Sequence, residues 1–218
     1  MAAVAVLTAT NPAALDAAGD VIDAGGIVAM PTRRWYMLCA DSGNEHACGS
    51  IFAGKGRPMT KPLALVLPTD EAVTDRFVLS PAARRLADRL WPGDLALRLP
   101  WRRPDDAGRR PWLGAGPPLV TREPGLLGAL AGRVRNPIAA AVVSRSDGRT
   151  PEQRAPALSA AAVLAFADAY AAPIDLLVDG GVCPLGIGLT VVDCTAEPVV
   201  VRAGAVHERA VEAALRDP

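Results

Sequence analysis

The sequence predicts a mixed α/β fold (α/β or α+β) in which helices flank one sheet. Three observations point to this class. Short apolar runs of strand length alternate with helical segments along nearly the whole chain. Proline, glycine or aspartate bounds most of the apolar runs, as expected for strands. Helix-start signals precede the first and third helical segments.

In the first half of the chain, local signals define three helices and three strands. Asn11 precedes Pro12, and Ser80 precedes Pro81, in the order expected of an N-cap and a first helical turn. Pro68 ends a buried apolar strand. We expect helices over residues 12–24, 44–54 and 81–90, and strands over residues 26–32, 34–41 and 62–68.

The second half continues the alternation around two long loops. Residues 101–117, rich in Arg, Pro and Gly and containing two tryptophans, indicate a surface loop, and residues 145–157 indicate a polar one. The length of 218 residues suits one domain or at most two small ones, and no internal repeat is evident; we expect a single domain over residues 1–218. We expect strands over residues 94–100, 118–124, 138–144, 174–181, 190–195 and 198–204, and helices over residues 126–134, 159–171 and about 207–216.

The composition limits the classes of partner. Half of the residues are hydrophobic, so the chain can bury a core without disulfides. The 23 basic residues balance the 23 acidic ones. Proteins that coat nucleic acid usually carry a basic excess, so this balance disfavours nucleic acid as a partner. Of the basic residues, 21 are arginines, which is typical of a GC-rich genome, and only Lys55 and Lys61 are lysines.

The sequence has no metal-binding spacing. The four cysteines and two histidines form no C-x-x-C or H-x-x-x-H pattern, so we expect no metal site. Cys39 and Cys194 lie in apolar runs and are expected in the core. His46 and His207 lie near helix starts, where solvated or capping roles dominate. With no basic leader and no run of 18 apolar residues, we expect a cytoplasmic protein without a membrane span.

The strongest candidate for a site is a basic turn before the strand at residues 62–68. Lys55, Arg57 and Lys61 fall within seven residues that contain no acidic partner. Lysine supplies a mobile point charge and arginine a two-pronged donor, and phosphates accept both. Gly56 lets the backbone approach a ligand closely. The pattern differs from the P-loop, and a solvated basic turn is the alternative.

Two further segments carry groups that suit a ligand site. Residues 30–36 end one strand and place Thr32, Arg33 and Arg34 before the next, where charged groups often form a ligand rim. A solvated turn is the alternative. Residues 180–193 join two strands through a glycine-rich loop, and Arg202 ends the following strand. On its own, this loop indicates a wide hairpin.

Taken in order, seven segments resemble the motifs of the YrdC-like family, which includes the threonylcarbamoyl-adenylate synthases. The family's motifs are G-G-x-V-A-x-P-T-E-T-x-Y-G-L, K-x-R-P-x-x-N-P-L, W-P-G-P-L-T, R-x-P, S-A-N-x-S-G, G-x-x-S-T-V-V-D and R-x-G. The corresponding residues here are 25–38, 55–63, 91–95, 122–124, 142–144, 188–193 and 202–204. The resemblance covers about residues 12–206 and identifies the chain as a divergent member.

This resemblance implies a twisted mixed sheet curved around a large, positively charged cavity. Members of the family bind ATP, bicarbonate and L-threonine and make threonylcarbamoyl-adenylate and pyrophosphate for tRNA modification. Related domains in carbamoyltransferases form carbamoyl-adenylate. The implied reagents are ATP with Mg²⁺, and bicarbonate or carbamoyl phosphate. Cations that hold a triphosphate and offset charge at the reacting phosphorus suit this chemistry, which needs no side-chain nucleophile.

The resemblance also implies a set of site residues. The implied catalytic residues are Lys55 and Arg57. The implied nucleotide-binding residues are Lys55, Arg57, Lys61, Ser144, Arg149 and Arg202. The implied substrate-binding residues are Thr32, Arg33, Arg34, Tyr36, Arg122, Val142, Leu189 and Thr190.

Departures from the motifs fall among the polar groups that hold the amino acid in the family. Arg33 and Arg34 replace a Glu and a Thr, which inverts the local charge and suits a carboxylate or phosphate if both side chains point inward. Val66, Val142 and Leu189 replace a His and two Ser. A pocket that cannot pair a buried polar group often rejects the substrate carrying it by ~10⁴-fold.

We therefore expect an ATP-dependent adenylate-forming enzyme, of the nucleotidyltransferase type, that makes a carbamoyl- or N-carboxy-amino-acid adenylate. We expect it not to be specific for threonine and to serve a specialised pathway such as natural-product biosynthesis. The alternatives are the housekeeping L-threonylcarbamoyladenylate synthase and a degenerate nucleotide- or double-stranded-RNA-binding module. The expected partners are small-molecule substrates and a transferase that accepts the adenylate.

Overall fold

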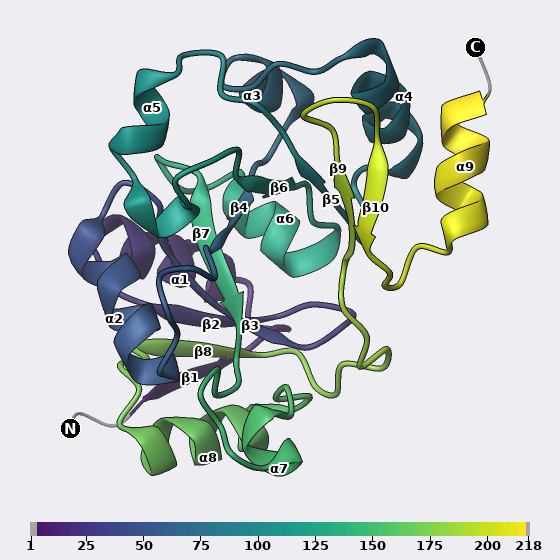
Figure 1. Ribbon diagram of the computed structural model, residues 1–218. Helices are drawn as coiled ribbons and strands as arrows, with labels where there is room; N and C mark the ends of the chain where they lie inside the picture. Colours follow the sequence, from purple (N-terminus) through teal and green to yellow (C-terminus); the bar gives the residue numbers. More distant parts are fainter. Residues whose placement is uncertain (1–3, 217–218) are drawn as a thin grey trace.

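The computed structural model describes residues 4–216, and Figure 1 shows them as a twisted sheet with helices packed around it. The strands in this part of the chain form one ten-stranded sheet. They are β1 (Ala5–Thr8), β2 (Val28–Pro31), β3 (Tyr36–Asp41), β4 (Ala64–Val66), β5 (Leu95–Arg98), β6 (Leu119–Thr121), β7 (Ile138–Val142), β8 (Leu176–Asp179), β9 (Thr190–Asp193) and β10 (Val199–Arg202). The helices are α1 (Ala14–Asp23), α2 (Glu45–Lys55), α3 (Asp70–Thr74), α4 (Pro81–Leu90), α5 (Asp105–Gly108), α6 (Gly125–Ala131), α7 (Pro151–Arg154), α8 (Ala160–Tyr170) and α9 (Glu208–Arg216), with a 3₁₀ helix η1 (Pro111–Leu113).

Neighbouring strands in the sheet are often far apart in the sequence. The order is β1-β8-β2-β3-β7-β4-β6-β5-β9-β10. The parallel neighbours are β1 with β8, β8 with β2, β4 with β6 and β5 with β9, and the other described neighbours are antiparallel. The predicted mixed sheet flanked by helices is therefore confirmed. The central strands β7 and β4 join two halves of the sheet.

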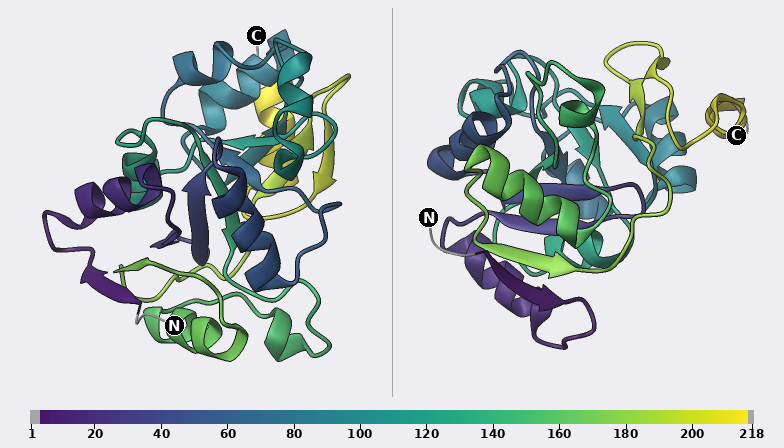
Figure 2. Two further views of the ribbon diagram at one scale, coloured as in Figure 1. Left: turned by 90° about the vertical axis from the view of Figure 1, so that its left-hand side faces the viewer. Right: turned by 90° about the horizontal axis from the view of Figure 1, so that it is seen from below.

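Both faces of the sheet are covered, which explains why several strands are apolar without alternation. Along β3, Tyr36 and Leu38 point into one hydrophobic layer, and Met37 and Cys39 point into the other. Helices α2, α4, α8 and α9 contribute to the first layer, and α1 and α6 contribute to the second. Figure 2 shows the same helices around the sheet from two further directions.

Capping residues begin α2 and α4. The predicted cap at Ser80 is confirmed, whereas the predicted cap at Asn11 is wrong, because α1 begins at Ala14 after Ala13, and Asn11 accepts a hydrogen bond from the amide of Ala13 ahead of the helix. The side chain of Asn44 accepts a hydrogen bond from the amide of Ala47 at 3.0 Å and begins α2. Gly56 ends α2 in the left-handed conformation, with φ of 54°. Ser80 caps α4 in the same way as Asn44 caps α2, with Pro81 in the first turn. The end of α2 leads directly into the basic turn.

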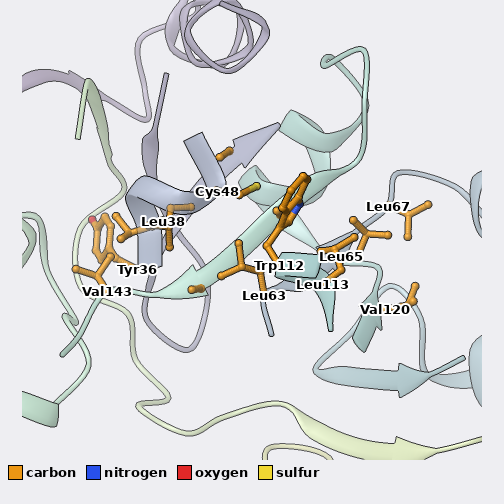
Figure 3. Packing of buried hydrophobic residues seen from close by; sticks show 14 of the residues in the cluster. Tyr36, Leu38, Cys48, Leu63, Leu65, Leu67, Trp112, Leu113, Val120 and Val143 are labelled. Atoms are coloured by element: carbon orange, nitrogen blue, oxygen red, sulfur yellow. The ribbon is translucent and has the colours of Figure 1, made fainter. Parts of the chain in front are cut away.

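The prediction of a surface loop over residues 101–117 is wrong for part of that segment. It contains α5 and η1, and Trp112 of η1 is buried, with its Nε1 donating to the carbonyl oxygen of Ser42 at 3.0 Å. Figure 3 shows Trp112 packed among side chains that include Leu63 and Leu113. The charged and proline-rich neighbours made the stretch look solvated, although its indole and leucine complete the core. The predicted polar loop over residues 145–157 likewise contains α7, which begins with a capping box at Thr150.

The glycine-rich loop after β8 is not the predicted hairpin. Strand β8 pairs with β1 and β2, whereas β9 pairs with β5 and β10, so the two strands that the loop joins are not neighbours. The loop therefore crosses from one half of the sheet to the other. The elements β1 and α3 also lie outside the predicted set; β1 has a mostly exposed burial pattern and so gives no alternating signal.

The remaining predictions on cysteine, histidine and membrane segments have clear outcomes. All four cysteines are free and buried, so the core positions of Cys39 and Cys194 are confirmed. The Nδ1 atom of His207 accepts a hydrogen bond from the amide of Arg209 at 3.2 Å, which is a capping role. No helix within residues 4–216 is long and apolar enough to cross a membrane.

Candidate functional site

Lys55 is a buried cation that lacks a carboxylate partner among the described residues. It ends α2, and none of its surface is exposed to solvent. Its Nζ donates hydrogen bonds to the carbonyl oxygens of Val142 and Ser144, at the end of β7. Burial lowers the pKa of Lys55 to about 7, and the positive charges of Arg57 and Arg145 act in the same direction. The ammonium form therefore lacks charge compensation.

Arg57 and Arg202 extend this group of cations. The guanidinium of Arg57 donates to the carbonyl oxygens of Lys61 at 2.6 Å and Pro62 at 2.7 Å. Arg202, at the end of β10, donates through Nε to the carbonyl oxygen of Leu189 at 3.2 Å. Burial, followed by the nearby charge of Arg202, lowers the pKa of Arg57. Arg202 is exposed at the surface, but loss of hydration on one side of its guanidinium, followed by the charge of Arg34, lowers its pKa. Cations that repel one another and pair only with carbonyl groups favour binding of an anion.

The loop after β7 is anchored to the end of α2 by Arg145. Its guanidinium makes two hydrogen bonds to the carboxylate of Asp147, at 2.7 and 2.6 Å. It also donates to the carbonyl oxygen of Gly54 at 3.1 Å and lies 4.7 Å from the ring centroid of Tyr170. These contacts hold the backbone carbonyls of β7 against Lys55.

The implied nucleotide-binding residues are only partly brought together. Lys55 contacts the backbone of Ser144 and lies close enough to Arg57 for their charges to interact, and Arg57 interacts in the same way with Arg202. The side chains of Lys61 and Arg149 are exposed, as is that of Arg202, but no described side-chain contact joins Lys61 or Arg149 to this group. We refer to Lys55, Arg57 and Arg202 below as the cation cluster.

The structure corrects the hypothesis that Arg33 and Arg34 offer free positive charge to an anionic substrate. The buried guanidinium of Arg34 lies between the buried carboxylates of Asp94 and Glu123 and pairs with both. The exposed side chain of Arg33 pairs with the same Asp94. Two cations thus meet two anions, and no net charge is left for a ligand. Burial raises the pKa of Glu123, and the charge of Arg34 opposes this shift.

The other implied polar substrate-binding side chains have hydrogen-bond or ion-pair partners within the protein. The Thr32 hydroxyl donates to the carbonyl oxygen of Trp35 at 2.8 Å and closes the turn between β2 and β3. The Tyr36 hydroxyl donates to the carbonyl oxygen of Gly181 at 2.8 Å, and burial raises its pKa to about 12. Arg122 pairs with the carboxylate of Asp70, and the hydroxyl of Thr190 donates to the carbonyl oxygen of Val206. Val142 and Leu189 present apolar side chains.

The glycine-rich loop covers the turn that carries the arginine pair. The amide of Leu185 donates to the carbonyl oxygen of Arg33 at 3.0 Å, and the amide of Gly186 donates to the carbonyl oxygen of Arg34 at 3.1 Å. Both bonds join the loop after β8 to the β2–β3 turn. The loop therefore fixes the backbone of this turn while the carboxylates fix its side chains.

The pairing of Asp94 and Glu123 with Arg34 was not predicted from the sequence, because these residues lie 60 and 89 residues from Arg34. A signal was nevertheless present. Asp94 stands at the second proline of the family's W-P-G-P-L-T motif, and Arg33 and Arg34 stand at the Glu and second Thr of P-T-E-T. Opposite charges that appear together at several departures from a motif indicate that the residues pair with each other.

Comparison with known proteins places this fold in a family. A family model for Sua5, YciO and YrdC proteins, described as telomere recombination, matches residues 20–204. The chain belongs to this family. Threonylcarbamoyl-AMP synthase of Bacillus subtilis is 31% identical over 210 residues, which are 94% of this chain and 58% of that protein. Threonylcarbamoyl-AMP synthase of Pyrococcus abyssi is 31% identical over 199 residues, 89% of this chain and 55% of that protein.

Solved structures of YrdC/Sua5 proteins share the fold. A double mutant of P. abyssi Sua5 matches with a TM-score of 0.82 at 27% identity. The match covers 98% of this chain and 63% of the Sua5 chain. P. abyssi Sua5 complexed with L-threonine has a TM-score of 0.79 at 29% identity and covers 93% of this chain and 57% of its own. Escherichia coli YciO has a TM-score of 0.75 at 20% identity, covers 97% and 100%, and shares the fold. This YrdC/Sua5 chain spans a little over half the length of the curated relatives it matches.

The described residues of this YrdC/Sua5 chain contain no group of three or more His, Cys, Asp or Glu side chains that could hold a metal ion. A magnesium ion held mainly by nucleotide phosphates needs few protein ligands. The use of Mg²⁺ with ATP therefore stays a prediction.

Proposed function

We propose that this chain is an adenylate-forming enzyme that transfers AMP from ATP to a carbamate and releases pyrophosphate. The observation that carries this proposal is the cation cluster, in which Lys55, Arg57 and Arg202 have only carbonyl partners among the described residues. An ATP triphosphate supplies the negative charge that this cluster lacks. The relatives named threonylcarbamoyl-AMP synthase support the same reaction.

The cation cluster would act on the phosphates rather than on the acceptor. Arg57 and Arg202 present planar donors that suit two oxygens of a phosphate at once. Charge at the reacting phosphorus and on the leaving pyrophosphate grows in the transition state. Preorganised cations in a partly buried site stabilise that charge without having to reorient. No side-chain nucleophile takes part, because the carbamate oxygen attacks the α-phosphorus and pyrophosphate leaves.

Threonylcarbamate, formed from L-threonine and bicarbonate, is the first candidate acceptor. It is supported by the names of the relatives and by the likeness to Sua5 complexed with L-threonine. The adenylate is a reactive mixed anhydride, so a transferase that consumes it is the expected partner.

A second candidate acceptor is the carbamate formed from bicarbonate and an amino acid other than threonine, or the carbamate that hydrolysis of carbamoyl phosphate yields together with inorganic phosphate. It is favoured by the apolar side chains of Val66, Val142 and Leu189, which stand where the family has a histidine and two serines. A threonine hydroxyl or carboxylate would find fewer partners there.

Pyrophosphate release from ATP and bicarbonate tests the proposal. The assay includes L-threonine, L-serine or carbamoyl phosphate, with a reaction lacking any acceptor as the control, and mass spectrometry identifies the adenylate. Threonine-dependent release supports the first candidate, and release only with another acceptor supports the second. Nucleotide binding without pyrophosphate release under any condition would contradict an adenylate-forming function.

A further inference from the structure

The protonation of Lys55 depends on what binds beside it. The charged side chains that act on it are Arg57, on the turn after α2, and Arg145, on the loop after β7, and both are positive. The carboxylate of Asp147 is turned to Arg145, with which it makes two hydrogen bonds. Two backbone carbonyls accept hydrogen bonds from Nζ, but they carry no net charge to balance an ammonium ion.

This environment makes the ammonium form unstable in the free protein. A buried ammonium without a counterion loses its hydration, and side chains of this kind often neutralise instead. The two neighbouring guanidinium groups cannot give up their protons at ordinary pH, so Lys55 is the cation that relieves the repulsion. The lowered pKa of Lys55, about 7, agrees with this description.

A bound phosphate chain would favour the ammonium form of Lys55 over the neutral form. An anion held by Arg57 offsets the positive charge that disfavours the Lys55 ammonium. The bound anion attracts the Lys55 ammonium across the same buried region through which Arg57 repels it. Because this region is buried, the attraction is strong. The two carbonyls are already placed to accept hydrogen bonds from the ammonium.

We propose that Lys55 takes up a proton from solvent when the phosphate chain of a nucleotide binds at Arg57 and Arg202. The proton adds to the lone pair of Nζ, and no other bond is formed or broken. Nucleotide affinity is therefore coupled to pH. It weakens by up to about tenfold for each pH unit above neutrality, until the pH is high enough for Lys55 to be deprotonated in the bound protein as well as in the free protein. This inference rests on the proposed nucleotide site.

The composition of the chain makes a direct measurement practical. Lys55 and Lys61 are its only lysines, so a protein labelled with ¹³C at lysine Cε gives two side-chain signals. The Lys61→Arg variant assigns them, because it retains the signal of Lys55 alone. Lys61 is exposed, and in the unmodified protein it serves as the internal reference.

The experiment titrates both signals between about pH 5 and 10 in the free protein, with ATP and with inorganic tripolyphosphate. We expect Lys55 to titrate near neutral pH in the free protein. Saturating ATP or tripolyphosphate should raise the Lys55 titration by about one pH unit or more. Isothermal titration calorimetry in buffers of different ionisation enthalpy should show net proton uptake on binding at pH 8.

Two results would overturn the inference. One is a free-protein titration of Lys55 above about pH 9. The other is an unchanged Lys55 titration at saturating ATP and tripolyphosphate, including the case in which neither anion binds. The proposed function fails separately, because an upward shift with tripolyphosphate or ATP, without adenylate formation, keeps the coupling and rejects the enzymatic activity.

Discussion

Lys55 and Arg34 are both buried basic side chains, yet their neighbours give them different roles. Arg34 pairs with two carboxylates, so its charge is balanced within the protein. Lys55 donates only to carbonyl oxygens, so its charge can be balanced by a ligand. Both residues were singled out from the sequence for their charge. The sequence could not separate them, because the carboxylates of Asp94 and Glu123 come from distant segments.

Loss of the Arg34 guanidinium should destabilise the protein. Arg34→Met leaves the buried carboxylates of Asp94 and Glu123 without their central partner, which typically costs about 3–5 kcal/mol. Urea denaturation measures the change. The control is the double variant Arg34→Met with Glu123→Gln, which should recover part of the loss because one buried charge is removed. Equal stability of Arg34→Met and the unmodified protein would show that the arginine pair does not hold the turn.

Loss of Arg202 should impair nucleotide use without unfolding. Arg202→Gln removes a charge from the cation cluster, and one charge-assisted contact to phosphate contributes ~1.5–3 kcal/mol. We therefore expect kcat/KM for ATP to fall by roughly 10- to 100-fold. The matched control is Arg135→Gln, since Arg135 is 82% exposed and pairs with Asp23 away from the cluster. Equal effects of the two substitutions on kcat/KM would argue against a phosphate role.

The stability of the free protein should rise with pH between about 7 and 8. The unfolded chain keeps the Lys55 ammonium up to its ordinary pKa of about 10.4, whereas the folded protein loses that proton near pH 7. Across this window the unfolded state holds more protons, so the free energy of unfolding increases, by at most about 1.4 kcal/mol per pH unit. Urea midpoints at pH 7, 7.5 and 8 measure the slope.

The Lys55→Met variant is the control for this pH dependence, because it should flatten the slope. Above about pH 8 a second effect opposes the first, because an unperturbed thiol has a pKa of about 8.5. Burial raises the pKa of all four cysteines in the folded protein, so their thiols ionise first in the unfolded chain and stability falls as pH rises further. A slope that Lys55→Met leaves unchanged below pH 8 would assign the dependence to another group.

At the scale of elements, the contact between α2 and the loop after β7 decides the geometry of the cation cluster. Helix α2 was predicted over residues 44–54, within one residue of its observed bounds at each end, because a helical segment is a local signal. The loop after β7 was predicted only as polar and solvated, although Arg145 and Asp147 anchor it to the helix. The pairing that makes this loop structural is a tertiary contact.

Gly56 should be irreplaceable at this contact. Its φ is positive, and an added Cβ would lie 2.2 Å from Oδ2 of Asp147 and 2.5 Å from Nη2 of Arg145. Gly56→Ala should therefore displace the Arg145–Asp147 pair, destabilise the protein by about 1–2 kcal/mol and raise the KM for ATP. The matched control is Gly49→Ala in the same helix, where an added Cβ meets nothing within 4 Å. It should be neutral or slightly stabilising.

At the scale of the whole molecule, the order of strands explains what the sequence could and could not predict. Strands such as β3 and β7 are apolar and short, so their existence was predicted and is confirmed. Their neighbours were not predictable, because β8 joins β1 and β2 across a long stretch of chain. The same holds for the glycine-rich loop, which looks like a hairpin locally and crosses the sheet globally. The resemblance of the ordered motifs predicted the family, because it used the whole chain at once.

The balanced net charge of the whole chain argues against binding of double-stranded RNA. The 23 basic residues equal the 23 acidic ones, and within the described part many arginines are paired with carboxylates. We expect no retention on double-stranded RNA at physiological ionic strength, together with measurable binding of ATP. Filter binding across a salt series measures this. A tight affinity that falls steeply with salt would favour the RNA-binding alternative.

The buried cysteines lie in four different parts of the fold: Cys39 in β3, Cys48 in α2, Cys183 in the glycine-rich loop and Cys194 just after β9. A thiol reagent can reach such a side chain only after the surrounding structure opens. The rate at which each thiol is alkylated in the native protein therefore reports the opening of one region. If nucleotide slows the alkylation of Cys183 and leaves that of Cys39 unchanged, the glycine-rich loop opens transiently in the free protein and the ligand stabilises its closed conformation.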